Sequence, residues 1–348
     1  MVVIRPVLDS DLEAVYSLSA NANIGLTTLP HDKEVLARRI KESQRTFVFE
    51  PEKPKGETYL FVAEDTANHK LVGTSAIISK VGGFQPNYTY QIQTVTKESK
   101  LLNVCKEIQY FKLRIDHNGP SEIGTLFLSP EYRGRRNLGR LLSLSRFLFM
   151  AQFSHCFEAI VIAEMRGVID DSGRSDFWEA LGKHFFEVEL KKADLMVMKD
   201  KSFIAELMPK HPIYLPLLPK EAQEVIGRAH RNTRPALHLL EQEGFKFTGE
   251  VDIFEAGPVV SCKVKKVRMV KESRIGRVDE IRSSIANSSE YIIANVNRME
   301  SFRACVGGVL IVADSSIALS HAAAKALKIT IGDSVRYSPI RPISRIQK

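Results

Sequence analysis

The fold of this chain is decided by one stretch, Gly124-Thr-Leu-Phe-Leu-Ser-Pro-Glu-Tyr-Arg-Gly-Arg-Arg-Asn-Leu-Gly-Arg-Leu-Leu-Ser-Leu-Ser-Arg-Phe147. It predicts an apolar strand over 123–128, a loop rich in Arg, Gly and Asn, and a helix over 137–152. The first N–H groups of a helix lack partners, and the helix dipole makes that end positive. The stretch therefore indicates a phosphate-binding loop, with an exposed basic helix start as the alternative.

The residues expected to contact the phosphates lie between the end of the strand and the first turn of the helix. Gly134 and Gly139 permit a close approach of the backbone, and Asn137 tolerates positive φ. The arginines add positive charge. The predicted contacts are Arg133, Arg135, Arg136, Asn137, Leu138 and Gly139.

The composition is typical of a soluble globular protein with more than one subdomain, since the chain has 348 residues, 44% of them apolar and 26% charged. No apolar run is long enough to span a membrane, and the N-terminus lacks the pattern of a signal peptide. The cysteines are scattered without metal-ligand spacing, so we expect reduced thiols, a cytoplasmic location and no metal. They are Cys105, Cys156, Cys262 and Cys305.

Working outward from the stretch, apolar periodicity predicts an α+β fold with a mixed sheet flanked by helices. Strands are expected over 2–5, 59–63, 71–77, 123–128, 159–164 and 185–190, and helices from 9, over 32–44, over 137–152 and over 176–182. Gly182 is expected to end the last of these helices.

Three domains are predicted. The first, 1–195, carries the basic loop. The second, 196–262, holds a partial repeat of the first, because the helix–Gly–strand pattern that starts at Arg234 is similar to the one that starts at Asp176. The third, 263–348, is β-rich, with a strand over 309–313 and a helix over 316–327, and it has no recognisable chemistry, so we expect a structural or assembly role.

The order of elements and the basic loop resemble the GNAT acyltransferase superfamily, which binds acyl-CoA through a Q/R-x-x-G-x-G/A loop after a splayed fourth strand. With Gly139 as the last glycine, Asn137 stands where the earlier glycine is expected and Gly134 where Arg or Gln is expected. Arg133 lies one residue early. The resemblance implies that the bound anion is the pyrophosphate of CoA.

Longer blocks resemble the arginine N-succinyltransferase family. They are Ile4-Arg-Pro, Gly25–Pro30, Ala163–Asp170, Asp176-Phe-Trp178, Phe203–Tyr214, Ala222–Gly227 and Asp252–Pro258. The resemblance implies transfer of the succinyl group of succinyl-CoA to the α-amine of L-arginine in arginine catabolism. Some members of the family favour L-ornithine or act as one of two paired subunits.

The resemblance also assigns roles to single residues. His230, between Ile226-Gly227 and Pro235-Ala236, matches the catalytic proton donor of the family. Histidine suits proton transfer because its pKa lies near neutral pH. Leu126 matches a succinyl-CoA position, where its backbone would pair with pantetheine amides, and Leu128 on the same strand is expected to contribute to the same site.

An arginine acceptor needs a carboxylate for its guanidinium and a cation for its carboxylate. Glu164 and Arg166 are the predicted substrate-binding residues, with Asp170 and Glu206 as other acids near family blocks. All four could instead form structural ion pairs.

Two other interpretations stay open. The departures in the basic loop fit a non-catalytic partner subunit of a heteromeric enzyme. The net charge of +8 fits a basic nucleic-acid-binding protein, although aromatic residues do not interleave with the basic clusters. We favour an enzyme with small-molecule substrates, without nucleic-acid or membrane partners, that assembles as a homo- or hetero-oligomer.

Overall fold

The structure, a computed structural model, describes residues 1–21, 28–198, 200–285 and 289–342. Its first ten strands are β1 (Val2–Pro6), β2 (Thr58–Asp65), β3 (Lys70–Ile78), β4 (Asn87–Ser99), β5 (Val104–Asp116), β6 (Ser121–Leu128), β7 (Ile160–Glu164), β8 (Ile213–Tyr214), β9 (Lys246–Asp252) and β10 (Pro258–Lys263). The C-terminal strands are β11 (Arg274–Arg282), β12 (Glu290–Asn295), β13 (Ala304–Gly308), β14 (Leu310–Ala313), β15 (Ser316–Ser320) and β16 (Ser334–Pro339).

The helices of the described residues lie on both sides of these strands. They are α1 (Leu12–Ala20), α2 (Lys33–Phe49), α3 (Leu138–Gln152), α4 (Lys183–Phe186), α5 (Leu190–Val197), α6 (Ser202–Leu207), α7 (Lys220–Val225), α8 (Arg234–Gln242), α9 (Arg268–Lys271) and α10 (His321–Leu327). None of those helices combines the length and the apolar character needed to cross a bilayer.

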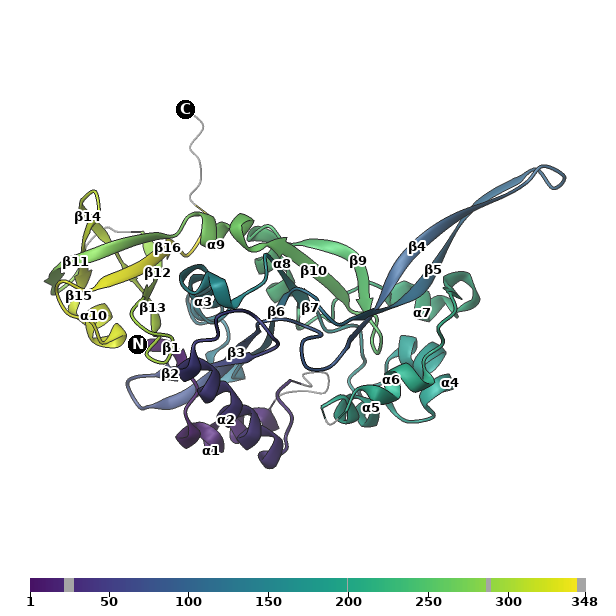
Figure 1. Cartoon of the computed structure of the whole chain (residues 1–348), viewed down its shortest axis with the longest axis horizontal. Helices are drawn as coiled ribbons and strands as arrows, with labels where there is room; N and C mark the ends of the chain where they lie inside the picture. Colours follow the sequence, from purple (N-terminus) through teal and green to yellow (C-terminus); the bar gives the residue numbers. More distant parts are fainter. Residues whose placement is uncertain (22–27, 199, 286–288, 343–348) are drawn as a thin grey trace.

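The strands hydrogen-bond in one series along the molecule, in the order β14-β15-β11-β16-β12-β13-β1-β2-β3-β6-β7-β10-β9-β4-β5-β8. In the middle of this series, α3 packs on one face around Phe61 and Phe149, while α1 and α2 cover the other face around Ile40 and Val62 (Figure 1). Both faces are thus covered by helices, and the predicted α+β mixed sheet is confirmed.

The parallel strands β6 and β7 separate soon after they begin. They pair only at Ser121↔Val161 and Glu122↔Ile162. Beyond that point β6 stays paired with β3, whereas β7 pairs with β10 along its whole length. A bulge at Thr125, whose φ is +52°, bends β6 at the place where the separation opens. The separation leaves the facing edges of both strands available to a ligand.

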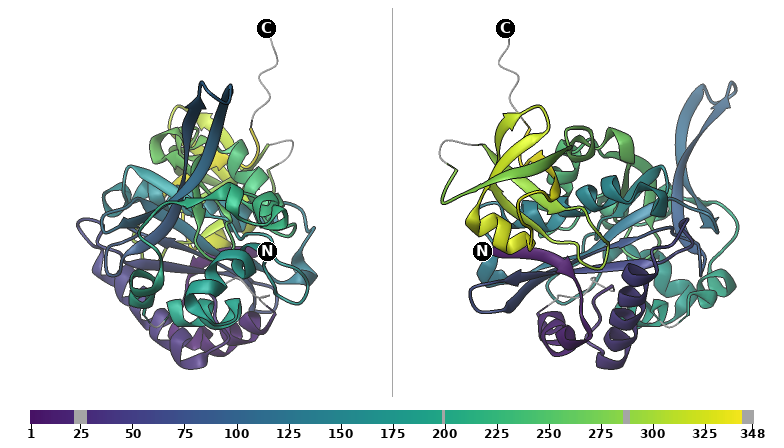
Figure 2. Two further views of the ribbon diagram at one scale, coloured as in Figure 1. Left: turned by 90° about the vertical axis from the view of Figure 1, so that its right-hand side faces the viewer. Right: turned by 60° about the vertical axis from the view of Figure 1, so that its left-hand side comes forward.

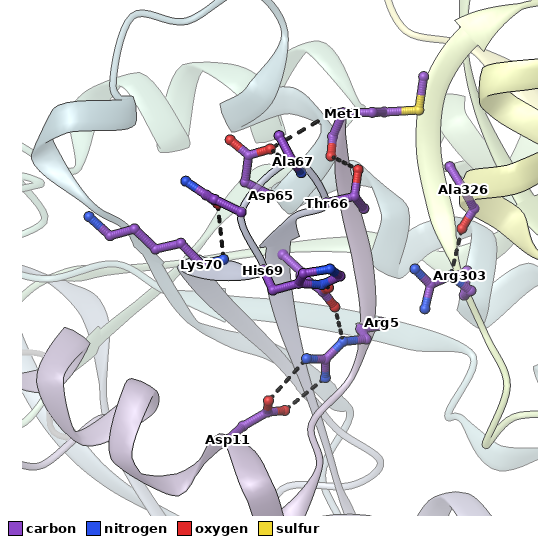
Figure 3. A network of polar contacts seen from close by, with 12 residues as sticks. Met1, Arg5, Asp11, Asp65, Thr66, Ala67, His69, Lys70, Arg303 and Ala326 are labelled. Carbon is purple, nitrogen blue, oxygen red and sulfur yellow. Dashed lines mark hydrogen bonds and ion pairs between the residues drawn. The ribbon is translucent and has the colours of Figure 1, made fainter.

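The C-terminal strands β11–β16 and helix α10 have an apolar cluster of their own, pair with the rest of the sheet at β1, and also pack against α3 through β12 and β16. Ile4 pairs with Ala304 of β13, and the Phe302 ring packs 5.7 Å from that of Phe61. Next to this junction, Arg5 forms ion pairs with Asp11 at 2.7 Å and Glu64 at 2.6 Å (Figure 3). The third predicted domain therefore contacts the rest of the sheet through backbone pairing and side-chain packing.

The predicted second domain shares its strands with the first. β10 pairs with β7 and β9 pairs with β4, so residues 246–263 continue the same sheet. The helix–Gly–strand unit itself is present as α8, Gly244 and β9. The division into three domains at 195 and 262 stays a prediction.

A long hairpin that the sequence did not predict projects from the molecule. Strands β4 and β5 pair over their full lengths, from Asn87↔Asp116 to Ser99↔Val104, and their far half extends beyond the body (Figure 1 and Figure 2, right). Side chains near its tip are exposed, with Leu101 at 94%. Polar and apolar residues mix on both faces of this outer half, which thus lacks the one-sided apolar pattern that indicates a strand. The inner half of β4 does carry that pattern, in Tyr88, Tyr90 and Ile92.

Two predicted elements are wrong. Residues 185–190 were expected as a strand but hold the end of α4 and the start of α5, because Phe186 stacks on Trp178 as part of a helical cluster. Residues 316–327 were expected as one helix, but β15 occupies the first five and pairs with β11 and β14. Gly182 also does not end the predicted helix, because a π-helical turn over Trp178–Gly182 continues directly into α4. A Cβ on Gly182 would lie 2.3 Å from the Trp178 ring, so packing requires the glycine.

Other predictions are confirmed. The hairpin of β2 and β3, the strand β6, the helix α3 and the strand β7 form within a few residues of their expected bounds. All four cysteines are free thiols, and three of them are buried.

Candidate active site

The basic loop between β6 and α3 is open to solvent and leads into α3, whose N-terminus has no side-chain cap. Asn137 precedes α3 with φ +61°, and its side chain does not cap the helix. A Cβ added to Gly134 or Gly139 would meet no atom within 4 Å. The first turn of α3 therefore presents N–H groups and a positive dipole end to open space, as a phosphate site requires.

The loop's arginines differ in how they are held. Arg133 donates from Nε to the Leu128 carbonyl at 3.0 Å, and the Arg135 guanidinium lies 3.7 Å from the centre of the Tyr132 ring. Arg136 instead pairs with Glu290 of β12 at 3.1 Å. Arg133 and Arg135 thus keep their charge without a carboxylate partner among the described residues, whereas the charge of Arg136 is partly neutralised.

Asn137 connects the loop to the C-terminal strands. Its amide nitrogen donates to Glu290 at 2.6 Å, and its carbonyl oxygen accepts from Arg341 at 3.4 Å. The left-handed backbone that a glycine would provide in this loop is supplied by asparagine, which tolerates it better than most residues. The departure from the glycine pattern therefore preserves the backbone shape and adds an attachment to β12.

A cavity of about 220 Å³ lies on the α3 side of the β6–β7 separation. Its walls come from both strands, from α3 and from the start of α8. Leu126 lines it, while Leu128 packs against the neighbouring apolar core. Arg133 reaches its rim from the basic loop, so the cavity and the loop are continuous.

Arg146 of α3 lies in the wall of this cavity and was not predicted. Its guanidinium is buried and donates to the Gly124 carbonyl at 3.2 Å and to the Ser143 carbonyl at 2.9 Å. Burial lowers the pKa of Arg146 to about 9. Its hydrogen bond to Gly124 holds the strand edge next to the bulge at Thr125.

A second cavity, of about 380 Å³, lies on the other side of the separation, between α2, α5 and the β9–β10 loop. Its charged lining is mostly acidic. The acids are Glu122, Glu164, Asp194, Asp252 and Glu255, and the bases are Arg39, Arg166 and Lys201. The cavity thus suits a ligand that carries a positive charge together with a carboxylate.

Burial disfavours the ionised forms of these acids. It raises the pKa of Glu122 to about 8, with a further contribution from the charge of Glu164. It also raises the pKa of Glu164, although Asn87 donates a hydrogen bond to that carboxylate at 3.1 Å. A cation that entered the cavity would favour the ionised forms and would be bound in exchange for protons.

The two cavities share the residues at the point where β6 and β7 separate, namely Gly124, Thr125, Glu164, Met165 and Arg166. The predicted substrate residues Glu164 and Arg166 are therefore brought together at this junction. The Nε atom of Arg166 is buried and has no hydrogen-bond partner in the described structure.

His230 lies directly beside this junction. Its backbone N–H donates to the Arg166 carbonyl at 2.9 Å, and its ring is buried. The ring is not itself part of the described lining of either cavity, but the following residues Asn232 and Thr233 line the α3-side cavity. The Nδ1 atom accepts the Asn232 N–H at 3.2 Å, which leaves the proton of a neutral ring on Nε2.

The environment of His230 favours its neutral form. Burial, and then the positive charges of Arg166 and Arg231, lower the pKa of the imidazole below its usual value. A histidine that is neutral near pH 7 can accept a proton and pass it on, as general acid–base catalysis requires.

The other predicted acids lie elsewhere. Asp170 holds its own turn, with its carboxylate accepting from the N–H groups of Ser172 and Arg174, and Glu206 lies exposed on α6. The residues that sequence reasoning missed include Glu122, Asp194 and Glu255. Glu122 carried a signal, because it is a charged residue within an apolar strand. The described residues contain no group of three or more His, Cys, Asp or Glu placed to hold a metal ion.

Comparison with known proteins assigns the chain to a family. The family described as arginine N-succinyltransferase beta subunit matches residues 2–269, and its C-terminal domain matches residues 274–339. Curated arginine N-succinyltransferases from two Salmonella strains, schwarzengrund and agona, are each 44% identical over 97% of this chain and 97% of their own length.

A solved structure is similar along the whole chain. It is the arginine/ornithine succinyltransferase subunit AI from Pseudomonas aeruginosa, with a TM-score of 0.89, 32% identity, and coverage of 98% of this chain and 99% of that one. The chain is therefore an acyltransferase that belongs to the arginine N-succinyltransferase family.

Proposed function

We propose that this protein transfers the succinyl group of succinyl-CoA to the α-amine of L-arginine, as a step of arginine catabolism. The observation that carries the proposal is the meeting of two cavities at the β6–β7 separation, one continuous with the basic loop and one lined by acids. A thioester that enters from the α3 side would meet an amine that enters from the α2 side. The identity of the acyl group and of the acceptor is proposed from the names of the similar proteins.

On the donor side, the start of α3 and the basic loop would hold the pyrophosphate of CoA. The contacts proposed are those of Arg133, Arg135, Arg136, Asn137, Leu138 and Gly139. The backbone of Leu126, at the free edge of β6, would pair with the pantetheine amides. Leu128 supports the loop, since its carbonyl accepts from Arg133.

On the acceptor side, Glu164 and Arg166 would bind the amino acid at the junction. Glu164 would attract the amino group as it enters, and Arg166 would pair with the α-carboxylate. Both residues line both cavities, so the α-amine that they orient would face the incoming thioester. Holding the two reactants in this geometry accounts for a large part of the rate that an enzyme of this class needs.

The chemistry requires one proton to move from nitrogen to sulfur. The α-amine, after losing its ammonium proton to solvent, attacks the thioester carbonyl, and the C–N bond forms as the C–S bond breaks. The neutral ring of His230 would take the proton that the nitrogen loses after attack and, as an imidazolium, would donate a proton to the departing thiolate, which restores the neutral ring. Direct attack is preferred because the sequence offers no nucleophile paired with a base.

An assay of free-thiol release tests the proposal. Protein supplied with succinyl-CoA should release CoA thiol when L-arginine is added, and L-ornithine in place of arginine tests the other acceptor of the family. His230→Ala should lower kcat by about 100-fold or more. His238→Ala is the matched control, because His238 is an exposed histidine on α8, eight residues further along, and should retain activity. Absence of thiol release with both acceptors would refute the proposal, and equal activities of the two variants would remove the role of His230.

The setting of the enzyme is also a proposal. Four free cysteines are consistent with the reducing cytoplasm. The similar Pseudomonas protein is named as a subunit, which favours a homo- or hetero-oligomer here. Light scattering of the purified chain, alone and with arginine, would measure the assembly.

A further inference from the structure

Two buried acids form the part of the acidic cavity that is contributed by α5 and the β9–β10 loop. Asp194 lies on α5 and is 9% exposed, and Glu255 lies in the loop between β9 and β10 and is 5% exposed. Both line the 380 Å³ cavity, and neither lines the cavity on the α3 side. They are therefore not among the residues that the two cavities share, although Glu255 lies close to Arg166 through its hydrogen bond with Gly167.

The loop that carries Glu255 is held rigidly by the neighbouring acid. The Asp252 carboxylate accepts from the Phe254 N–H at 2.8 Å and from the Gly257 N–H at 2.7 Å. Asp252 is thus occupied with the loop backbone. Gly167 and Gly257 allow this loop to lie against the chain after β7, where a Cβ on Gly257 would come within 1.9 Å of the Met165 carbonyl oxygen.

One oxygen of Glu255 lacks a partner. Its Oε2 accepts from the Gly167 N–H at 2.9 Å, but its Oε1 is buried and has no hydrogen bond within the described residues. A buried acceptor without a donor is unfavourable, so such groups are usually satisfied by a ligand, a water or a neighbour. In this cavity the missing donor would come from whatever the cavity binds.

The electrostatics point to a cation. Burial raises the pKa of Asp194 to about 7, and burial together with the charges of Asp252 and Asp194 raises the pKa of Glu255 well above its usual range. Arg166 opposes both effects, but its contribution is smaller than that of burial. A ligand with several N–H donors would pair with both carboxyl groups at once.

We propose that Asp194 and Glu255 bind the side-chain guanidinium of the acceptor and thereby set the preference for arginine. The guanidinium is a planar, permanently charged group with five N–H donors, which can reach two carboxylates together. An alkylammonium has only three donors on one nitrogen. The proposal rests on the proposed function, because it takes the α-amine of the acceptor to lie at the junction near Glu164 and Arg166.

The test compares arginine with citrulline, which has nearly the same shape but a neutral urea in place of the guanidinium. Thiol release from succinyl-CoA is measured with each acceptor for the wild type, Asp194→Asn and Glu255→Gln. Each variant should lower kcat/KM for arginine by about 10- to 100-fold, because charge-assisted hydrogen bonds contribute about 1.5–3 kcal/mol. The value for citrulline and the KM for succinyl-CoA should change less than about threefold.

The matched control is Glu250→Gln, which neutralises a part-buried acid on β9 that pairs with Arg114 outside this cavity. It should keep the wild-type ratio of arginine to citrulline. In Glu255→Gln, the amide oxygen can still accept from the Gly167 N–H, and melting curves verify that both test variants fold. A thermal-shift titration with arginine, in the absence of succinyl-CoA, should show the same loss of affinity.

The outcomes separate the inference from the function on which it rests. If the wild type releases no thiol with arginine, the proposed function fails. If the wild type is active but Asp194→Asn and Glu255→Gln keep its arginine-to-citrulline ratio, the inference is overturned. Glu122→Gln should weaken arginine and citrulline alike, since both carry the α-amino group. The inference is equally overturned if Glu122→Gln alone changes the ratio, since the guanidinium would then lie beside β6.

Discussion

The two cavities on either side of the β6–β7 separation are built in opposite ways. The α3-side cavity is basic at its rim, and half of its lining residues come from one continuous stretch, 123–146, while the other half come from 163–166 and 232–240. The other cavity is mainly acidic, and its charged residues come from segments as far apart as Arg39 and Glu255. The comparison shows that the basic loop and half of the α3-side wall are local in sequence, whereas the acidic cavity is assembled entirely from segments that folding brings together.

The largest expected effect comes from disturbing the junction that the two cavities share. Gly257→Ala would place a Cβ 1.9 Å from the Met165 carbonyl oxygen and 2.6 Å from the Gly167 nitrogen, both of which are backbone atoms. The free energy of unfolding should fall by about 3 kcal/mol, as seen for overpacked sites. The variant should release no CoA thiol, whether the concentration of succinyl-CoA or that of arginine is varied. Denaturant titration and steady-state kinetics would measure both effects.

Gly139→Ala is the matched control for that substitution. No atom lies within 4 Å of the added Cβ, and alanine favours the helix by up to about 1 kcal/mol. The variant should therefore keep its stability, and it should raise the KM for succinyl-CoA alone, because the methyl group enters the proposed phosphate site. A stable Gly257→Ala variant would show that the junction is less rigid than the structure indicates.

The acidic cavity should couple arginine binding to proton release. The pKa of Glu122 is raised from 4.5 to about 8, so the folded protein holds this proton more tightly than the unfolded chain. The stability of the free protein should therefore decrease as the pH rises from about 4.5 to about 8. Arginine, which favours the ionised carboxylate, should bind about tenfold more weakly for each pH unit below the pKa.

Calorimetric titration of arginine without succinyl-CoA, in two buffers of different ionisation enthalpy, would measure the released proton. Glu122→Gln should abolish that part of the proton release and flatten the pH dependence of arginine affinity. Binding of CoA serves as the internal control and should keep its own pH dependence in the variant. Unchanged proton release in Glu122→Gln would assign the linkage to another acid of the cavity.

The smallest expected effects are those of substituting single arginines of the basic loop, and they differ between Arg135 and Arg136. Arg135→Ala should raise the KM for succinyl-CoA by about fivefold at low salt, a difference of about 1 kcal/mol that screening reduces. Arg136→Ala should change it less than about twofold, because Arg136 already pairs with Glu290. Neither variant should change the KM for arginine. Equal effects of the two substitutions would mean that the pair with Glu290 opens when CoA binds.

The sequence predicted β6, the basic loop and α3 well for a physical reason. The strand, the loop and α3 are neighbours along the chain, so turn chemistry and helix periodicity describe them directly. Asn137 departs from the glycine pattern, yet its φ of +61° preserves the left-handed backbone that the loop needs. Knowing that conformation required the structure, because its contacts with Glu290 and Arg341 lie far along the chain.

The acidic cavity was predicted only in part. Glu164 and Arg166, which the family block singled out, do line it. Asp194 lies in no quoted block, and Glu255, although inside the block Asp252–Pro258, was not singled out, since α5 and the β9–β10 loop meet only through tertiary packing. Because residues 185–190 were predicted as a strand, the helix that follows and carries Asp194 was not predicted.

The β4–β5 hairpin was missed although the inner half of β4 alternates Tyr88, Tyr90 and Ile92 with polar residues. Only its outer half, which is exposed on both faces, shows no apolar side.

The central claim is that donor and acceptor occupy separate cavities that meet at the β6–β7 separation. The most direct measurement is a matrix of KM values for succinyl-CoA and for arginine in the wild type, Arg135→Ala, Glu122→Gln and the double variant. The account predicts that Arg135→Ala raises only the KM for succinyl-CoA, that Glu122→Gln raises only the KM for arginine, and that the double variant combines both, as independent sites do. A single substitution that raised both KM values equally would contradict it.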